Sequence, residues 1–591
     1  MGKGKNMSLK YDVVIIGAGN AGLTAACRAS IMGLKCLVIE KNNTVGGAAA
    51  SFVRGRFEFE ASLHEIPDFG TGENRGILGH LFDDLGIKME WLSIPDAYRF
   101  IVSEVGNESE HLMDFTVPHG RDKFSEYMEK HVPGSTPSVR LFFESADLVS
   151  RCVEYLGQSR GNPDPQILNT EHAEAMKILS LGTGEFFRTI KMPQKAIDII
   201  SAYWPYQGSD IETIDASRYL LMADSYFSGG AYMPKMRSHE IANELEKVAR
   251  KKGCDFWYNT EVTKILTRDG AVCGVETSNG LTVEACAVVS NAFPDTVYGR
   301  LLDNKSLIPA YELKKANARQ FGFRAFVLYL GLDATPEELG IKDYTVFMYP
   351  TTDTMALFNK VCEDDLSGEM IALNLTATCI NIINPDATPP GTCHFALTSA
   401  YITDIWDTVS PADYNRIRHR VASAMLDRYE KVMEINIRSH IEEVSIATPV
   451  TFARYLGTPQ GSVYGYHSST WDGMSARTLA GGGELTVPGL FFVGAHANRL
   501  SGFLPTLTDG DITARQVMGY VMSGGDSYGK GRPPKSAGPG GSGRPGGPGG
   551  SGVPGRPGRP DGAGVPGGPG GSPNGMGNRS GASQGAGGGR S

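Results

Sequence analysis

Three glycines near the start of the chain have the spacing of a nucleotide-binding turn. Gly17, Gly19 and Gly22 form the pattern G-x-G-x-x-G. In such a motif the first glycine permits a tight turn, the second lets backbone approach a pyrophosphate, and the third removes a Cβ where a helix packs on a strand. Glu40 follows eighteen residues after Gly22, where a carboxylate can accept hydrogen bonds from a ribose. These residues predict a dinucleotide site, without separating NAD from FAD.

The elements that must position these residues follow from the apolar pattern around them. Residues 12–16 read as a short buried strand of a parallel sheet covered on both faces. A helix rich in small residues follows the glycines, and Gly33 can end it in a left-handed conformation. A second strand over residues 35–39 leads to Glu40. A glycine-rich turn alone is weak evidence, but strand, turn, helix, strand and acid together predict a Rossmann-type unit.

The residues after Glu40 resemble one family of flavoproteins. Residues 41–66 read KNNTVGGAAASFVRGRFEFEASLHEI. The Gly46-Gly47 pair after an acid and a short spacer resembles the FAD-dependent group of phytoene desaturases, carotenoid isomerases and retinol saturases. The stretch FEFEASLHEI is similar to the retinol saturase form of the next strand. The resemblance implies FAD as the cofactor, with the glycine pair along its pyrophosphate and ribityl chain.

Two later segments extend the resemblance over most of residues 11–522. Residues 228–294 are similar to the family's return to the flavin domain, with a helix followed by short strands divided at Asp269-Gly270 and Asn279-Gly280 turns. The closing segment, residues 447–466 and 487–522, is also similar to the family. A helix after Thr508-Asp509-Gly510 is expected there to point its N-terminus at the flavin pyrimidine ring. A helix dipole there stabilises negative charge on a reduced flavin.

The motif and the resemblance together specify the cofactor contacts. By resemblance, the backbone at Val262 lies against adenine. One departure from the family is Ala495, which stands where an acid usually contacts the cofactor. The loss of one such hydrogen bond costs roughly 1 to 3 kcal/mol, and His496 or Asn498 could compensate. The predicted FAD contacts are Gly17, Gly19, Asn20, Ala21, Gly22, Glu40, Lys41, Gly46, Gly47, Ala48, Val262, Gly494, Ala495, Gly502, Leu504 and Asp509.

The segment that follows the glycine pair contains two candidates for proton transfer. His64 and Glu60 follow the pair closely enough to approach the isoalloxazine ring. The alternative for His64 is a structural histidine bonded to backbone. No H-E-x-x-H sequence, paired C-x-x-C or Walker loop is present. The sequence therefore supports neither a metal site nor phosphoryl-transfer chemistry.

The predicted fold class is α/β, with a Rossmann-type FAD-binding domain, an inserted α+β substrate domain and a disordered Gly/Pro-rich tail. The stretches between the cofactor segments alternate helical and strand-like apolar patterns. Their many aromatic residues fit either core packing or the lining of an apolar tunnel. The predicted boundaries are 1–70, 226–298 and 445–522 for the FAD-binding domain, 71–225 and 299–444 for the substrate domain, and 523–591 for the tail.

The last part of the chain cannot build a hydrophobic core. From residue 530 onward it holds 25 glycines and 11 prolines. Glycine recurs every third residue from Gly540 to Gly558, as in collagen, but the run is short, and a flexible linker is favoured over a stable trimer. Residues 530–591 carry a net charge of +7, and residues 1–529 carry −16. A basic tail can approach anionic lipid, whereas the acidic body argues against a nucleic-acid surface.

Cysteine use and the chain start bear on location. The nine cysteines are scattered and form no C-x-x-C pair, which indicates reduced thiols in the core of a cytosolic protein. The start lacks the apolar run of a secretory signal, and Asn6 stands where a myristoylation motif needs Ser or Thr. No apolar window is long enough to span a bilayer. A cytoplasmic location is expected, with peripheral membrane contact and oligomer formation left open.

The resemblance implies an oxidoreductase that removes, adds or rearranges a carbon–carbon double bond in an apolar polyene or isoprenoid-like lipid. Hydride would move between a substrate carbon and flavin N5. Desaturation, saturation and isomerisation stay open. The electron partner is unknown, because no second convincing G-x-G-x-x-G marks a nicotinamide site. Two alternatives remain. One is a non-enzymatic lipid carrier resembling Rab GDP-dissociation inhibitors, which needs no intact cofactor cradle. The other is a flavin amine oxidase, which lacks the retinol saturase-like stretch.

Overall fold

The computed structural model describes residues 9–525, apart from 71, 73–74, 160–161, 403–404, 468–469, 475, 478–486 and 498–500. Residues 1–532 form one compact unit. Residues 526–591, which hold nearly all of the predicted tail, and Asn498 lie outside the described residues.

A seven-stranded mixed sheet carries the glycine-rich start of the chain. Its order is β10-β2-β1-β13-β12-β11, and β19 pairs with β13. Strands β10, β2, β1, β13 and β19 run parallel to one another. Strand β12 is antiparallel to both of its neighbours, β13 and β11. The bounds are β1 Leu9–Ile16, β2 Cys36–Ile39, β10 Asp255–Trp257, β11 Val262–Arg268, β12 Ala271–Thr277, β13 Thr282–Ser290 and β19 Leu490–Phe492.

Strand β1 is apolar throughout its inner part because both faces of the sheet are covered. Val13 and Ile15 join the core on one face, whereas Val14 and Ile16 join the core on the other. Burial on both sides removes the polar alternation of a half-exposed strand. The predicted Rossmann-type strand is therefore confirmed, as is the turn at Asp269-Gly270, where both residues have positive φ.

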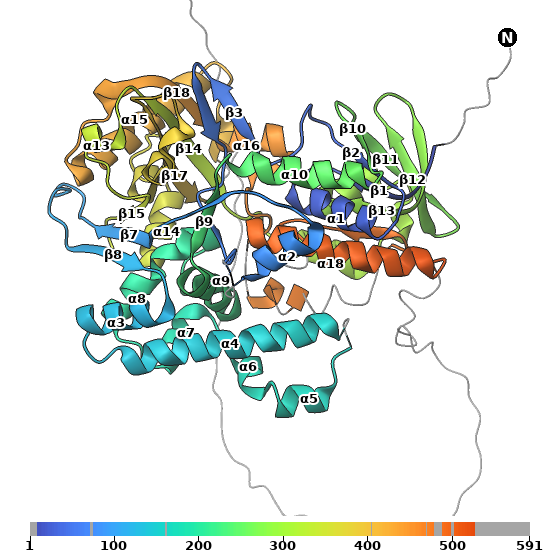
Figure 1. The fold of residues 1–591 in the computed structure, drawn as a ribbon, viewed down its shortest axis with the longest axis horizontal. Coiled ribbons are helices and arrows are strands. Elements are labelled where there is room, and N and C mark those ends of the chain that lie inside the picture. The colour runs from blue at the N-terminus through green and yellow to red at the C-terminus, as the bar shows by residue number, and fades with distance from the viewer. Residues whose placement is uncertain are drawn as a thin grey trace, which may run out of the picture. The chain divides into compact units, whose positions relative to one another are not determined.

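Three helices cover one face of this sheet. They are α1 (Asn20–Ile31), α10 (Ser238–Lys251) and α18 (Phe503–Met522), and Figure 1 shows α1 between the other two. The expectation that the last helix begins after Gly510 is wrong, because α18 begins at Phe503. An added Cβ on Gly510 would overlap the Ala21 carbonyl oxygen. Gly510 is thus a packing glycine inside the helix, which lets α18 touch the backbone of α1.

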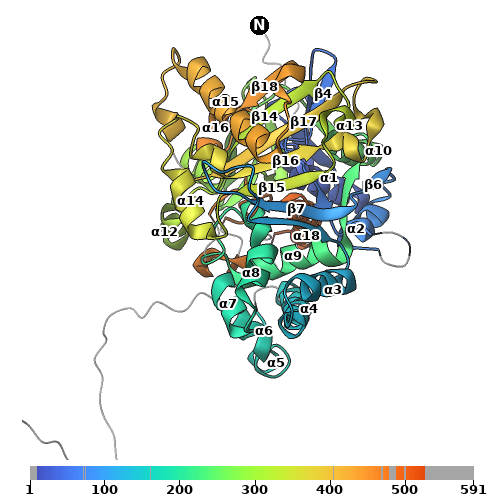
Figure 2. The same cartoon turned by 90° about the vertical axis from the view of Figure 1, so that its left-hand side faces the viewer.

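A second seven-stranded sheet, in the order β18-β14-β17-β16-β15-β7-β8, lies under its own hydrophobic core. Figure 2 shows its strands side by side, with α3, α4 and α7 gathered beyond β7. The strand bounds are β7 Asp96–Val102, β8 Met113–Pro118, β14 Arg324–Leu332, β15 Thr345–Tyr349, β16 Leu375–Cys379, β17 Cys393–Tyr401 and β18 Ile441–Ala447. The helix bounds are α2 Ile77–Leu85, α3 Arg121–His131, α4 Thr136–Gln158, α5 Pro165–Thr170, α6 Ala173–Ile178, α7 Thr183–Thr189, α8 Gln194–Ile200, α9 Ala216–Gly229, α11 Pro294–Thr296, α12 Ala310–Ala318, α13 Pro336–Leu339, α14 Thr354–Cys362, α15 Tyr414–Met433 and α16 Pro449–Leu456.

Short strands connect the two large sheets. The hairpin of β3 (Ser51–Arg54) and β4 (Phe57–Glu60) follows the glycine pair. A three-stranded sheet then joins β5 (Ile66–Pro67), β9 (Ala231–Pro234) and β6 (Trp91–Ser93). These strands hold the candidate catalytic segment between β4 and β5. The separate cores accord with the predicted FAD-binding and inserted regions, and the boundary residues stay a prediction.

Two further expectations can be compared with the structure. All nine cysteines are free, and Cys286 is exposed rather than part of the core. Among the helices that the structure describes, none combines the length and apolar character that crossing a membrane would require.

Candidate functional site

A cavity of about 1600 Å³ reaches from the first sheet to the second. Its wall includes Ile16 and Ile39 at the carboxyl ends of β1 and β2, and it includes Val327 and Thr398 from β14 and β17. Ligands of open parallel sheets bind at the carboxyl ends of the strands, where connections diverge. The predicted dinucleotide site and the second sheet therefore share one cavity.

The glycine-rich turn and the glycine pair form one backbone cradle in this cavity. Gly19 and Gly46 make a parallel β-bridge. A Cβ added to Gly19 would lie 2.7 Å from Asn291 Nδ2, and one added to Gly47 would lie 3.2 Å from the Gly19 Cα. Gly17 has a φ of 92°, which only glycine adopts readily. Side chains would fill this space, so the residues present leave room for a pyrophosphate.

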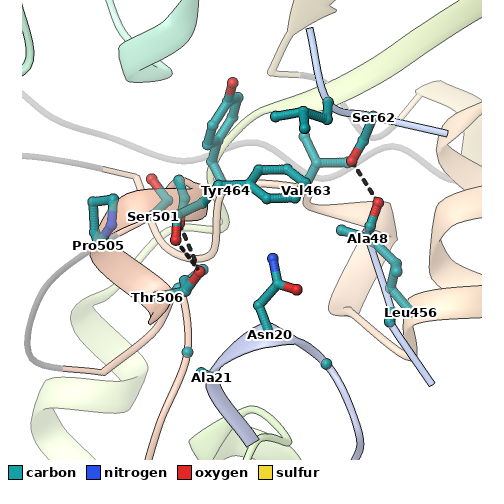
Figure 3. A pocket seen from close by; sticks show the side chains of 18 of the residues that line it. Asn20, Ala21, Ala48, Ser62, Leu456, Val463, Tyr464, Ser501, Pro505 and Thr506 are labelled. Carbon is teal, nitrogen blue, oxygen red and sulfur yellow. Dashed lines mark hydrogen bonds between the residues drawn. The ribbon is translucent and has the colours of Figure 1, made fainter. Parts of the chain in front are cut away.

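The N-terminus of α1 faces the same space without a side-chain cap. Gly19 is the N-cap residue, and it provides no side-chain cap hydrogen bond to the first turn in the described part of the chain. The Asn20 Oδ1 atom is buried and has no hydrogen bond within the described structure. Figure 3 shows Asn20 pointing into the pocket, between Ser501 on one side and Ser62 on the other. Free N–H groups at a helix N-terminus favour bound phosphate.

Glu40 lies at the end of β2 and both supports and lines the cradle. Its Oε2 accepts a hydrogen bond from the Ala18 N–H at 2.7 Å, and its Oε1 accepts one from the Asn42 N–H at 2.8 Å. Each carboxylate oxygen has a further lone pair for a ribose hydroxyl. Lys41 and Val262 also line this end of the cavity. The predicted cofactor contacts in this part of the chain are thus brought together.

The closing segment completes the wall. Of its predicted contacts, Gly494, Ala495, Gly502 and Leu504 line the cavity, but Asp509 does not. Asp509 is fully buried, and its Oδ2 accepts the Gly494 N–H at 3.1 Å. It therefore fixes the Gly494 loop on α18 from behind the wall.

Two other predicted residues also lie behind the wall. Gly22 does not line the cavity. An added Cβ at Gly22 would overlap the Gly17 carbonyl oxygen, so this glycine allows the helix to pack closely, as predicted for the third glycine of the motif. Glu60 is fully enclosed, and its carboxylate accepts hydrogen bonds from the Ser238 N–H at 2.9 Å and the Leu63 N–H at 3.2 Å. Burial raises the pKa of Glu60, and the Ser238 hydrogen bonds oppose that shift. Glu60 joins β4 to α10, and this geometry does not support its predicted proton-transfer role.

His64 does line the cavity, on the segment between β4 and β5. Its Nε2 lies 3.3 Å from the Thr398 hydroxyl, and its carbonyl oxygen accepts a hydrogen bond from Tyr344. Burial lowers the pKa of His64 to about 4, so the imidazole is neutral at neutral pH. His64 is therefore a weak base that can orient a polar group without carrying charge.

Sequence reasoning missed the neighbouring residue, Glu65. Its side chain lines the cavity with 5% exposure, and neither carboxyl oxygen has a hydrogen bond among the described residues. Burial raises the pKa of Glu65 to about 8, against a smaller opposing effect of the adjacent Tyr206 hydroxyl. Glu65 is thus a neutral acid at neutral pH. Its only signal in the sequence is an acid directly before the short apolar strand β5.

Arg218 on α9 was also missed. It lines the cavity with 5% exposure, and its Nη2 donates a hydrogen bond to the Ser501 hydroxyl at 2.7 Å. Burial, and then the nearby Arg477, lower the pKa of Arg218 to about 10, so the guanidinium keeps its charge at neutral pH.

Apolar side chains make up most of the wall on the side of the second sheet. They contribute a surface suited to a water-poor ligand. They include Phe52, Leu221, Met222, Tyr226, Ala325, Val327, Tyr329, Phe452, Val463 and Met474.

Comparison with known proteins bears on this site. Residues 12–292 match the model of the FAD binding domain family. The chain is similar to all-trans-retinol 13,14-reductase of Danio rerio, with 24% identity over 77% of each chain. It is also similar to chloroplastic prolycopene isomerase of Daucus carota, with 23% identity over 87% of this chain and 81% of that protein.

A solved structure has the same fold. An oxidoreductase from Methanosarcina mazei superposes with a TM-score of 0.56 at 15% identity, covering 86% of this chain and all of that one. These findings confirm FAD as the cofactor for which the cradle is built. The chain thus has an FAD binding domain, and it is similar to FAD-dependent proteins of the phytoene desaturase, carotenoid isomerase and retinol saturase-like group.

Proposed function

We propose that this protein is an FAD-dependent oxidoreductase or isomerase that acts on a carbon–carbon double bond of an apolar polyene or isoprenoid-like lipid. The observation that carries the proposal is the shared cavity, in which the glycine cradle opens directly onto an apolar wall. Two similar proteins are named for retinol and prolycopene, both of which are polyenes, and this supports the substrate class.

Different parts of the chain would bind different parts of FAD. The backbone around Gly19 and Gly46 and the N-terminus of α1 would hold the pyrophosphate, and Glu40 would hold a ribose. The N-terminus of α18 at Gly502 lies in the same wall and would favour negative charge at the flavin ring. Bound FAD supplies a site at N5 that exchanges hydride with a substrate carbon.

Glu65, which the sequence analysis did not identify, is the proposed proton-transfer residue. Glu65 replaces Glu60 in this role, because Glu65 lines the cavity and Glu60 does not. Its Oε atoms hold a proton at neutral pH, since burial raises their pKa to about 8. The neutral His64 imidazole beside it orients the substrate without competing for that proton. A group whose pKa lies near the working pH is suited to general acid–base transfer.

The test is an absorption spectrum of the purified full chain, followed by anaerobic reduction and incubation with all-trans-retinol, all-trans-retinoic acid and a poly-cis carotene. We expect near-stoichiometric flavin bands and at least one product with an altered double bond. Absence of flavin after reconstitution with FAD would contradict the proposal and favour the lipid-carrier alternative.

We further propose a cytoplasmic location with peripheral membrane contact. The nine free cysteines and the basic C-terminal segment support the location. Flotation of the protein with anionic and neutral vesicles tests the membrane contact, and equal recovery with both vesicle types would contradict it.

A further inference from the structure

Arg218 is the buried cation of the cavity wall. The other lysine and arginine side chains among the described lining residues are Lys41, Arg54 and Arg300, and all three are exposed. Arg218 lies in the first turn of α9 and is 5% exposed. Arginine is rarely buried without a partner, so the burial of this guanidinium indicates a specific role.

Among the described residues no carboxylate forms an ion pair with this guanidinium, and the buried Asp215 attracts it only from a longer distance. The Arg218 Nε and Nη2 donate to neutral groups, the Gln207 side-chain oxygen and the Ser501 hydroxyl, and Nη1 donates to none of the described residues. No Asp or Glu of the described structure lies within ion-pair distance of it. The nearest acid on its own helix, Asp215, is the N-cap of α9 and accepts hydrogen bonds from the N–H groups of Ser217 and Arg218.

A buried charge without a counter-ion is costly, and the cost falls when an anion binds to it. The guanidinium presents a planar fork that matches the two oxygens of a carboxylate. With two of its nitrogens positioned by Gln207 and Ser501, its orientation in the wall is fixed before any ligand arrives. This arrangement is that of a preorganised anion site.

The same helix face provides an apolar continuation. Arg218, Leu221, Met222, Ser225 and Tyr226 all line the cavity. Residues three, four, seven and eight positions after the first lie on one side of a helix. A ligand that meets the guanidinium can therefore extend along the Leu221, Met222 and Tyr226 side chains of the same wall.

Other acids of the wall do not cancel this positive charge. Asp147 and Asp224 form ion pairs with Arg121 at 2.7 and 2.9 Å. Glu65 is neutral at neutral pH, since burial raises its pKa to about 8. Asp68 is half-buried and accepts a hydrogen bond from the Ile77 N–H at 3.1 Å, and Asp511 forms ion pairs with Arg28 and Arg515. Asp84 and Glu154 are exposed to solvent.

We propose that Arg218 binds a carboxylate at one end of the substrate, so that the substrate class is an apolar polyene or long-chain acid rather than a hydrocarbon or an alcohol. This inference rests on the proposed function, because it names the end group of that function's substrate. A diphosphate end group is disfavoured because it would need several cations, and Arg218 is the single buried one among the described lining residues.

The experiment measures equilibrium binding to the FAD-loaded full chain by dialysis with three probes, all-trans-retinoic acid, all-trans-retinol and farnesyl diphosphate. The wild type should bind the acid at least about tenfold more tightly than the alcohol, the effect of a charge-assisted pair in a dry site. Arg218→Met should abolish this preference, and Arg218→Lys should keep part of it. Arg54→Met is the matched control, because it removes an exposed lining cation and should leave the preference unchanged.

Several outcomes would overturn the inference. Equal binding of acid and alcohol by the wild type would do so without any variant. Tighter binding of farnesyl diphosphate than of retinoic acid would replace the carboxylate by a phosphate. If Arg218→Met kept the acid preference but lost FAD or shifted the flavin reduction potential, the guanidinium would serve the cofactor. A failure of the proposed function looks different, since it would show as missing flavin or as no product from any polyene.

Discussion

The two ends of the cavity are built by different means. The cradle end consists of backbone, brought together by glycines at positions 17, 19, 46 and 47 that a side chain would obstruct. The opposite end consists of side chains from α9, β14, β17 and the β4–β5 segment, among them the buried Glu65 and Arg218. The cradle therefore tolerates almost no added atom. The properties of the opposite end, here called the chamber, depend on the charge and protonation state of its side chains. A change at one end should alter cofactor affinity, and a change at the other should alter chemistry and selectivity.

The largest expected effect belongs to the chamber. Glu65→Gln keeps the shape of the side chain but removes its ionisable proton, so turnover should fall by about 100- to 10,000-fold, the usual contribution of a general acid or base. Flavin content should be unchanged, because Glu65 has no part in the cradle. Rapid-mixing kinetics and a flavin spectrum measure the two quantities. Loss of flavin together with activity would break the division between the two ends.

The pH dependence of stability isolates the same carboxyl group. Burial raises the folded-state pKa of Glu65 from 4.5 to about 8, so the native state keeps a proton that the unfolded chain releases. The stabilising effect of that proton is complete below about pH 4.5 and is lost as the pH rises towards 8. Relative to Glu65→Gln, the wild type should lose on the order of 2–4 kcal/mol of unfolding free energy between these limits. Urea unfolding at about pH 5 and about pH 8 measures this, and parallel behaviour of the two proteins would contradict the assignment.

A bulky residue in the cradle should act on the cofactor alone. Gly19→Val adds a branched side chain at a position where even a single added Cβ would lie 2.7 Å from Asn291 Nδ2, so FAD affinity should fall by about ten- to a hundredfold. Gly299→Ala is the control, because an added Cβ there meets no atom within 4 Å. Flavin content after gel filtration reports the result. Full flavin retention by Gly19→Val would move the cofactor out of the cradle.

The smallest effect is expected outside both ends. Removal of residues 530–591 should leave the flavin spectrum and the unfolding midpoint unchanged, because the compact unit and α18 end before or near that point. Spectra and thermal unfolding of the truncated chain check this. A shift in the flavin bands on truncation would show that the segment contributes to the cavity.

The cradle was predictable residue by residue because its requirements are local. A positive φ at Gly17 and the close approaches at Gly19 and Gly22 exclude other side chains, so the motif itself carries the information. Errors entered where local signals were ambiguous. The Asp509-Gly510 pair reads as a turn, but Gly510 lies inside α18, because contact with the α1 backbone needs a residue without a side chain.

The chamber was not predictable in the same way. Glu60, His64 and Glu65 lie within six residues of one another, and sequence spacing cannot tell which of them faces the cavity. The structure turns Glu60 towards Ser238 at the start of α10 and leaves Glu65 beside Tyr206 without a hydrogen-bond partner among the described residues. Arg218 likewise gave no signal, because its significance lies in the carboxylate that is missing around it.

By itself, the sequence determined a Rossmann-type dinucleotide cradle, because short glycine spacings and an acid after a buried strand encode local backbone geometry. Its resemblance to a group of flavoproteins implied FAD. Only the tertiary structure decided which acid holds a proton and which arginine holds an unmatched charge. Burial and the identity of neighbours set these properties, and both arise from segments far apart in the chain.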